Sequence, residues 1–349
     1  MKKCISLLTA LSLILIGILS GCGDDTPSVP TVETTVAETT VAPTVALVEK
    51  DASLTPLLWK VTGDKGNTLY LFGTIHIGDE RNDSVLANLA DTIDECDAVA
   101  VECDVVAYQN DMEKMMQDLQ SDLYLDGTTV RDYMPDDLYE ECKAYLTEAG
   151  LYSSAYNYYD LSMWSQLMSA AAVTLSPYES KNAIDTKLIN YAYANNMELL
   201  EVESIDFQND MLDSFSDDLY LLEIREILEN KDSYSDALTE LYEAWLEGNE
   251  ENINLILEEG DTEGYTEEEL KMLENYTKTT LDDRNIGMTN KAIEYLNSDD
   301  SVFLAVGTAH MVGDKGIVKQ LTDKGYKVEK IELQYNEKAE YFGENLFSA

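Results

Sequence analysis

The sequence predicts a mixed α/β fold in which N-terminal and C-terminal segments form one central sheet and a large helical insert covers it. Short apolar runs typical of buried strands occur at residues 57–63, 68–74, 97–103, 302–306 and 327–333. Most of the chain between these two groups has the spacing of amphipathic helices. Strands at both ends of the domain therefore favour a single sheet joined from distant segments.

The first strands and the helix after them have clear local signals. Strands 57–63 and 68–74 flank Asp64-Lys65-Gly66-Asn67, a sequence that favours a hairpin turn. Residues 84–95 follow as a helix with Val85, Leu86, Leu89 and Ile93 on one face, and residues 97–103 form the next strand.

The insert is predicted as successive helices with one short strand. Helices fill residues 108–176, with Pro135 at a helix start, and the tyrosines at 152–159 form a packed face. A helix at 183–195 and a strand at 198–202 follow. The remaining helices are expected at residues 207–257, 266–296 with an interruption near Gly287, and 314–323.

The N-terminus predicts export and anchoring. Lys2 and Lys3 precede an apolar stretch, residues 5–19, that is short for a membrane-spanning helix. It ends in Leu19-Ser20-Gly21-Cys22, which resembles the lipobox of bacterial lipoproteins and implies cleavage before a lipidated Cys22. We therefore predict a signal peptide at 1–21, a disordered Thr/Pro linker at 22–54 and a domain at 55–349, held on the extracytoplasmic face of the cell membrane.

Composition excludes one class of partner. The chain has 68 acidic and 23 basic residues, a formal net charge of −45. No basic surface can form the phosphate contacts that nucleic-acid binding requires, so we exclude nucleic acid as a partner. After processing, Cys96, Cys103 and Cys142 are an odd and sparse set that argues against a disulfide framework, and we expect them to be buried thiols.

The two histidines are the strongest functional signal. They are the only ones in the chain, and both occur in the frame Gly-Thr-x-His, as Gly73 to His76 and Gly307 to His310. Each frame directly follows a predicted strand, and α/β sheets bind ligands at the carboxyl ends of their strands. We expect the imidazoles to lie within about 12 Å of each other at one end of the sheet.

Glu102 is the best candidate for a third group at this site. It ends the otherwise apolar strand 97–103, and a carboxylate there is costly unless it is paired or binds a ligand. Two imidazoles and a carboxylate are a donor set for a divalent ion. Alternation along the strand places Glu102 on the face of Ala100, but it does not show that the three side chains meet.

The sequence resembles the TraB/PrgY/GumN family over roughly residues 55–335. The resemblance rests on 58–61 with 69–76, on 99–102, on Ala183-Ile184-Asp185, on Glu201-Val202-Glu203 with Gln208, on Arg284-Asn285, and on 306–310 with Gly313, Gly316 and 325–328. Ala183 stands where the family usually has Gly. Relatives of this family include the Tiki metalloproteases, the ChaN-type haem-binding lipoproteins and the erythromycin esterases, so the resemblance implies an EreA/ChaN-like fold.

The resemblance implies a metal-dependent hydrolase that cleaves peptide bonds. Its site would consist of His76, Glu102 and His310 as metal ligands and catalytic groups, with Arg284 as a positive group that stabilises an oxyanion. Asp185 and Glu203 are second candidates, for direct chemistry or for orienting the first set. The ion would be Mn, Co or Zn.

Two alternatives remain open from the sequence. One is a protein that binds and sequesters a peptide or a haem-like small molecule without turnover. The other is a metal-free hydrolase of the esterase type, in which the His/Glu pair acts as a general base.

Overall fold

A computed structural model describes residues 48–258 and 264–331. Within these residues the chain forms a six-stranded mixed sheet surrounded by helices, which confirms the predicted fold class. The order of the strands is β4-β3-β5-β2-β1-β6. Their bounds are Leu58–Thr62 for β1, Thr68–Thr74 for β2, Ala98–Val101 for β3, Glu198–Glu201 for β4, Val302–Gly307 for β5 and Val328–Lys330 for β6.

The sheet joins the two ends of the domain at its centre. β1 and β2 form the predicted antiparallel hairpin, with Gly66 in the turn at a φ of +90° that favours glycine. β5 is parallel to both β2 and β3, and β3 is parallel to β4. In the pairing of β2 with β5, Thr74 lies opposite Gly307. The two Gly-Thr-x-His frames therefore leave the sheet side by side.

The helices lie between and after these strands. They are α2 Arg81–Asp94, α3 Val105–Asn110, α4 Met112–Ser121, α5 Asp136–Glu148, α6 Leu161–Thr174, α7 Ile184–Ala194, α8 Ile205–Asp213, α9 Asp217–Leu246, α10 Glu250–Glu258, α11 Glu267–Thr277, α12 Asp283–Leu296, α13 Thr308–Met311 and α14 Ile317–Asp323. Short 3₁₀ turns occur at Val130–Asp132, Ser154–Tyr158 and Ser180–Asn182, and a π-helical turn at Lys278–Asp282.

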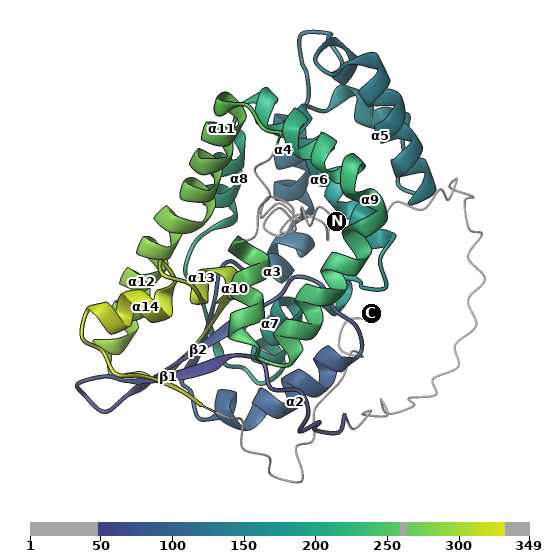
Figure 1. Cartoon of the computed structure of the whole chain (residues 1–349). Coiled ribbons are helices and arrows are strands. Elements are labelled where there is room, and N and C mark those ends of the chain that lie inside the picture. The colour runs from purple at the N-terminus through teal and green to yellow at the C-terminus, as the bar shows by residue number, and fades with distance from the viewer. Residues whose placement is uncertain (1–47, 259–263, 332–349) are drawn as a thin grey trace, which may run out of the picture.

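Helices cover both faces of the sheet. In β3, Val99 and Val101 pack into a core shared with α2, α6, α7 and α9, whereas Ala98 and Ala100 pack into a second core with α12 and α14. This alternation is the one that the sequence predicts for a strand buried on both sides. Figure 1 shows α2 on one side of the sheet, α12 and α14 on the other, and α5 and much of α9 extending away from it.

Several predicted boundaries are corrected. The interruption expected near Gly287 is wrong: α12 continues through this residue, whose position leaves open space where a Cβ would lie. The irregularity is instead the π-helical turn, where the Thr280 hydroxyl donates to the carbonyl oxygen of Tyr276. The helical segments predicted over 207–257 are α8, α9 and α10, with Ser216 before the start of α9 and Gly248, at a φ of +60°, between α9 and α10.

Other sequence predictions have mixed outcomes. Cys96, Cys103 and Cys142 are free and buried, as expected. The signal peptide, Cys22 and most of the linker lie outside the described residues, as does the end of the last predicted strand. In the described part of the chain, no helix is both long and apolar enough to cross a membrane.

Candidate functional site

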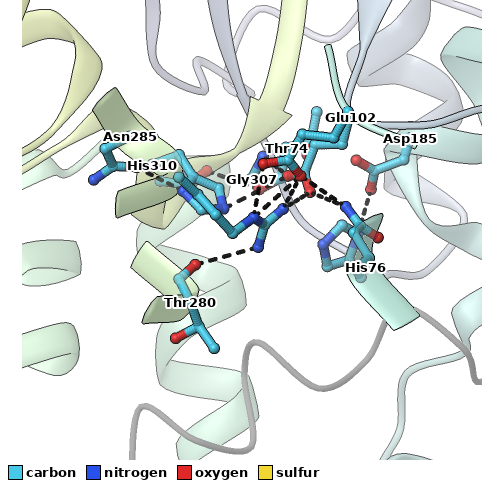
Figure 2. Close-up of polar contacts among 12 residues, drawn as sticks. Thr74, His76, Glu102, Asp185, Thr280, Asn285, Gly307 and His310 are labelled. Carbon is cyan, nitrogen blue, oxygen red and sulfur yellow. Dashed lines mark hydrogen bonds and ion pairs between the residues drawn. The ribbon is translucent and has the colours of Figure 1, made fainter. Parts of the chain in front are cut away.

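Four neighbouring parallel strands each lead into one polar residue of the site. His76 follows β2, His310 follows β5, Glu102 follows β3 and Glu203 follows β4. Because the carboxyl ends of these strands lie at the same edge of the sheet, the side chains gather there. The structure therefore brings together the three residues predicted as the centre of the site, and Figure 2 shows their polar contacts.

Gly307 lies at the point where the three side chains converge. A Cβ at this residue would be 3.3 Å from Glu102 Oε1, 3.6 Å from His310 Cδ2 and 3.9 Å from His76 Nε2. The two imidazoles are thus within about 7.5 Å of each other across this point. The absence of a side chain at Gly307 leaves that space open to a ligand.

Gly73 allows β2 and α13 to pack closely. A Cβ there would be only 2.7 Å from Thr308 Oγ1 and 3.1 Å from Thr308 Cα. The glycine lets β2 approach the first residue of α13, whose hydroxyl donates to the carbonyl oxygen of Thr74 at 2.9 Å. Because α13 carries His310, this contact fixes one imidazole relative to the strand that carries the other.

Glu102 is a buried carboxylate with three hydrogen-bond donors. Its Oε2 accepts from Arg284 Nη2 at 2.6 Å and from Gln208 Nε2 at 3.3 Å, and its Oε1 accepts from the Gly307 backbone at 2.8 Å. Burial raises the pKa of Glu102, but Arg284, the two histidines and the Gly307 N–H outweigh it and lower that pKa to about 2. The group is therefore a carboxylate at any physiological pH.

Arg284 forms hydrogen bonds to both buried carboxylates of the site. Its Nε and Nη2 donate to both oxygens of Glu203 at 2.7–3.1 Å, its Nη2 also to Glu102, and its Nη1 to the Thr280 carbonyl oxygen at 3.3 Å. Of the five N–H groups of a guanidinium, one on Nη1 is left among the described residues. Arg284 therefore holds Glu102 in position, and because it also lines the pocket its predicted contact with an oxyanion stays a prediction.

Asp185 orients His76. Its Oδ2 accepts a hydrogen bond from His76 Nδ1 at 3.0 Å, so His76 Nε2 is the ring nitrogen on the pocket side. Burial lowers the pKa of His76, but the Asp185 carboxylate and its hydrogen bond, helped by Glu102, raise it to about 9. The ring is therefore cationic at neutral pH in the absence of a bound ion.

His310 is held in the opposite charge state. Its Nδ1 lies 2.6 Å from Asn285 Oδ1, and Asn285 Nδ2 donates to the Lys315 carbonyl oxygen at 3.1 Å. The amide orientation makes Nδ1–H of His310 the donor and leaves Nε2 with a lone pair. Burial, with the nearby Arg284 charge, lowers the pKa of His310 to about 3, so this ring is neutral.

The structure adds two residues to which the sequence assigned no role. Gln208, which is 1% exposed on α8, donates to both Glu102 and Glu203, at 3.3 and 3.0 Å. Asn285 accepts a hydrogen bond from His310 Nδ1 and so sets the tautomer of that ring. The family resemblance contains both positions, but their roles depend on contacts between distant segments. The predicted second group, Asp185 and Glu203, acts by orienting His76 and Arg284.

The donor atoms of the site are of the kinds that bind a divalent ion, although they do not have the spacing of a formed metal centre. Both imidazoles have Nδ1 tied to an acceptor, as metal-binding histidines usually do. Glu102 Oε1 lies 3.9 Å from His310 Nε2, and no group of three or more His, Cys, Asp or Glu side chains within residues 48–258 and 264–331 has the spacing of a formed metal centre. The atoms that would hold an ion are Nε2 of His76, Nε2 of His310 and Oε1 of Glu102.

A pocket opens over these groups. Its lining includes the polar side chains of His76, Glu102, Arg284 and His310 and a set of side chains from α9 and α10. The site is therefore a pocket that combines a few polar groups with apolar side chains, which is typical of small-ligand and active sites.

Comparison with known proteins identifies the family of the chain. No curated protein and no solved structure matches the chain significantly. Residues 57–330, which include every strand of the sheet and all six residues predicted for the site, match the model of the TraB/PrgY/gumN family. Because this match covers well over half of the sequence, the chain belongs to the TraB/PrgY/gumN family.

Proposed function

We propose that this protein is a hydrolase that uses a divalent ion to cleave amide bonds, and that His76, Glu102 and His310 form its active site. The observation that supports the proposal is the pairing of two imidazoles, each fixed at Nδ1, with one buried carboxylate beside an open glycine. A bound ion would polarise the scissile carbonyl and lower the pKa of a water molecule. Mn, Co and Zn all suit imidazole and carboxylate donors.

The protein groups divide the remaining work. Glu102 stays ionised because Arg284 and Gln208 hold Oε2, and it presents Oε1 toward the pocket to hold the ion or accept a proton from water. The neutral His310 supplies a lone pair on Nε2 without losing a proton. His76 must release the Nε2 proton before it can bind an ion, so ion binding and proton release are coupled at this residue.

A specific observation supports a second candidate, hydrolysis without a metal. Glu102 already accepts from Arg284 and from the Gly307 backbone, which occupies part of its capacity for an ion. In this case the cationic His76 would stabilise the oxyanion or protonate the leaving group, and Glu102 would take the proton of the attacking water.

The deciding experiment combines metal analysis with peptide cleavage. The full chain, purified in detergent, is stripped with a chelator and assayed on a mixed peptide library with no metal, Mn²⁺, Co²⁺ or Zn²⁺. The metal-dependent hydrolase requires cleavage that disappears on stripping and returns with one of these ions. Cleavage that survives stripping supports the metal-free mechanism. If the protein retains peptides or haem but cleaves nothing under any condition, it is a binding protein and the hydrolase proposal is wrong.

Glu102→Gln is the matched test of the site itself. The substitution keeps the size of the side chain and removes the charge, and Glu198→Gln on the exposed end of β4 is its control. Cleavage must fall by about 10²-fold or more in Glu102→Gln and stay unchanged in the control. Equal activity in both variants would remove Glu102 from the mechanism.

We also propose that the protein acts on the extracytoplasmic face of the cell membrane, held there by a lipid on Cys22. The support is the Leu-Ser-Gly-Cys sequence at residues 19–22 and the Thr/Pro-rich segment after it. A peptide or small molecule outside the cytoplasm would then be the substrate.

A further inference from the structure

The part of the pocket lining that α9 and α10 contribute, here called the α9–α10 wall, is entirely apolar. Every residue that α9 and α10 contribute to the lining is hydrophobic: Leu238, Leu241, Trp245, Ile253 and Leu257. The three α9 residues are spaced at i, i+3 and i+7, and the two α10 residues at i and i+4, so each helix presents one continuous stripe to the pocket.

This wall has no hydrogen-bonding group to offer a ligand. Its one polar atom, Trp245 Nε1, donates to the Gly73 carbonyl oxygen at 2.8 Å. A ligand hydroxyl or amide placed here would lose its bonds to water without replacing them, whereas an aliphatic group would leave water at no such cost. The α9–α10 wall therefore favours binding of apolar groups over polar groups.

The α9–α10 wall is also held in a fixed position relative to the segment that carries His76. The bond from Trp245 ends on Gly73, the first residue of the frame that carries His76. The Trp245 ring meets Phe72 of β2 edge to face at 6.2 Å and stacks on Tyr242 at 5.9 Å. An apolar group seated on α9 and α10 would thus lie at a fixed position relative to the reacting groups.

We infer that the α9–α10 wall is a specificity pocket for an aliphatic side chain next to the bond that is cleaved. The cleavage step in this inference rests on the proposed function, whereas the preference for binding an aliphatic side chain does not depend on it. Leu241 and Leu257 are partly exposed within the lining, whereas Leu238, Trp245 and Ile253 are buried. The first two are therefore the residues that a substrate side chain touches first.

The test uses two blocked pentapeptides that differ in one residue, Ac-Ala-Ala-Leu-Ala-Ala-NH₂ and the same peptide with serine at the centre. Binding to the chelator-treated full chain is followed by the change in tryptophan emission, because Trp245 is the one tryptophan of three that lines the pocket. We expect the leucine peptide to bind at least about tenfold more tightly, because a hydrophobic site distinguishes groups that differ by a few methylenes by this order.

The matched variants lie two residues apart on α10. Leu257→Asn places an amide in the wall, and Leu255→Asn makes the same change at a residue that is 46% exposed and does not line the pocket. The preference for the leucine peptide must fall below about threefold in Leu257→Asn and persist in Leu255→Asn. Circular dichroism of both variants establishes that each is folded.

The outcomes separate the inference from the proposed function. A parent protein that prefers leucine but cleaves neither peptide keeps the specificity pocket and loses the hydrolase proposal. A parent that cleaves both peptides equally keeps the hydrolase and overturns the pocket. The pocket is also overturned if neither peptide binds, or if Leu257→Asn retains the full preference.

Discussion

The contact between Asp185 and His76 makes a sharp prediction about charge at the site. Asp185 Oδ2 accepts from His76 Nδ1 at 3.0 Å and is the main reason that the pKa of His76 rises to about 9. Asp185→Asn keeps the shape of the side chain and removes the carboxylate. We predict that this one substitution returns the pKa of His76 to its ordinary value of about 6.5 or below, because the burial that lowers it is then less opposed.

The size of the effect follows from the shift itself. The change from 6.5 to about 9 corresponds to roughly 3 kcal/mol that favours the protonated ring in the folded protein. A raised pKa contributes stability below the unfolded value and loses it as pH rises through the folded value. The parent should therefore lose up to about 3 kcal/mol of unfolding free energy between pH 6.5 and 9, and Asp185→Asn should lose far less over that range.

The assay is simple because the chain contains only two histidines. The Cε1 protons of the two rings give two signals in the proton NMR spectrum of the metal-free protein, and His310→Gln assigns them. The His310 signal should not move between pH 5 and 10, since the pKa of that ring is lowered to about 3. The His76 midpoint should lie near 9 in the parent and at least about 2 units lower in Asp185→Asn.

The matched control is Asp206→Asn. Asp206 is the second residue of α8 and follows an isoleucine, as Asp185 does in α7, but it pairs with Lys114 at the surface. It must leave the His76 midpoint unchanged. If both histidines of the parent titrate near 6.5, or if Asp185→Asn leaves the His76 midpoint at 9, the electrostatic account of the site is wrong.

The remaining predictions concern Glu102, two glycines and Cys22. Glu102→Gln should lose about 10²-fold or more in cleavage rate, measured against Glu198→Gln, with both variants retaining the parent's circular dichroism. Gly307→Ala places a Cβ 3.3 Å from Glu102 Oε1 and should reduce activity by about 10²-fold, whereas Gly287→Ala, with open space at its Cβ, should raise the unfolding free energy by about 0.5–1 kcal/mol. Cys22→Ser should move the protein from the membrane to the soluble fraction on cell fractionation, and membrane retention of this variant would contradict lipidation.

The strands and the polar residues that end them were predictable because both signals are local. Apolar runs at 68–74 and 302–306 indicate buried strands, and a histidine three residues after a glycine is a pattern that can be recognised from the sequence without a structure. The pairing of β2 with β5 is not local, since their residues are more than 200 positions apart and the register depends on packing. The convergence of His76 and His310 therefore required the structure.

The roles of the helical residues were hidden for the same reason. Arg284 was assigned to the oxyanion from the family resemblance, and only its contacts with Glu102, Glu203 and Thr280 show that it also holds the two carboxylates in position. The π-helical turn that presents the Thr280 carbonyl oxygen has no sequence signature. Periodicity predicts that α9 buries one face, but it does not tell which part of that face lines a pocket.

The helical insert consequently does more than cover the sheet. Each ionisable side chain at the strand ends is held by a residue from a helix: His76 by α7, His310 and Glu102 by α12, and Glu203 by both α8 and α12. The sheet thus fixes where the reacting groups emerge, and the helices set their charge and orientation. Substitutions of Asp185, Gln208 or Asn285 should change the chemistry of the site while leaving the sheet intact, because the polar contacts of these residues end on the side chains of the site and not on the strands' backbone.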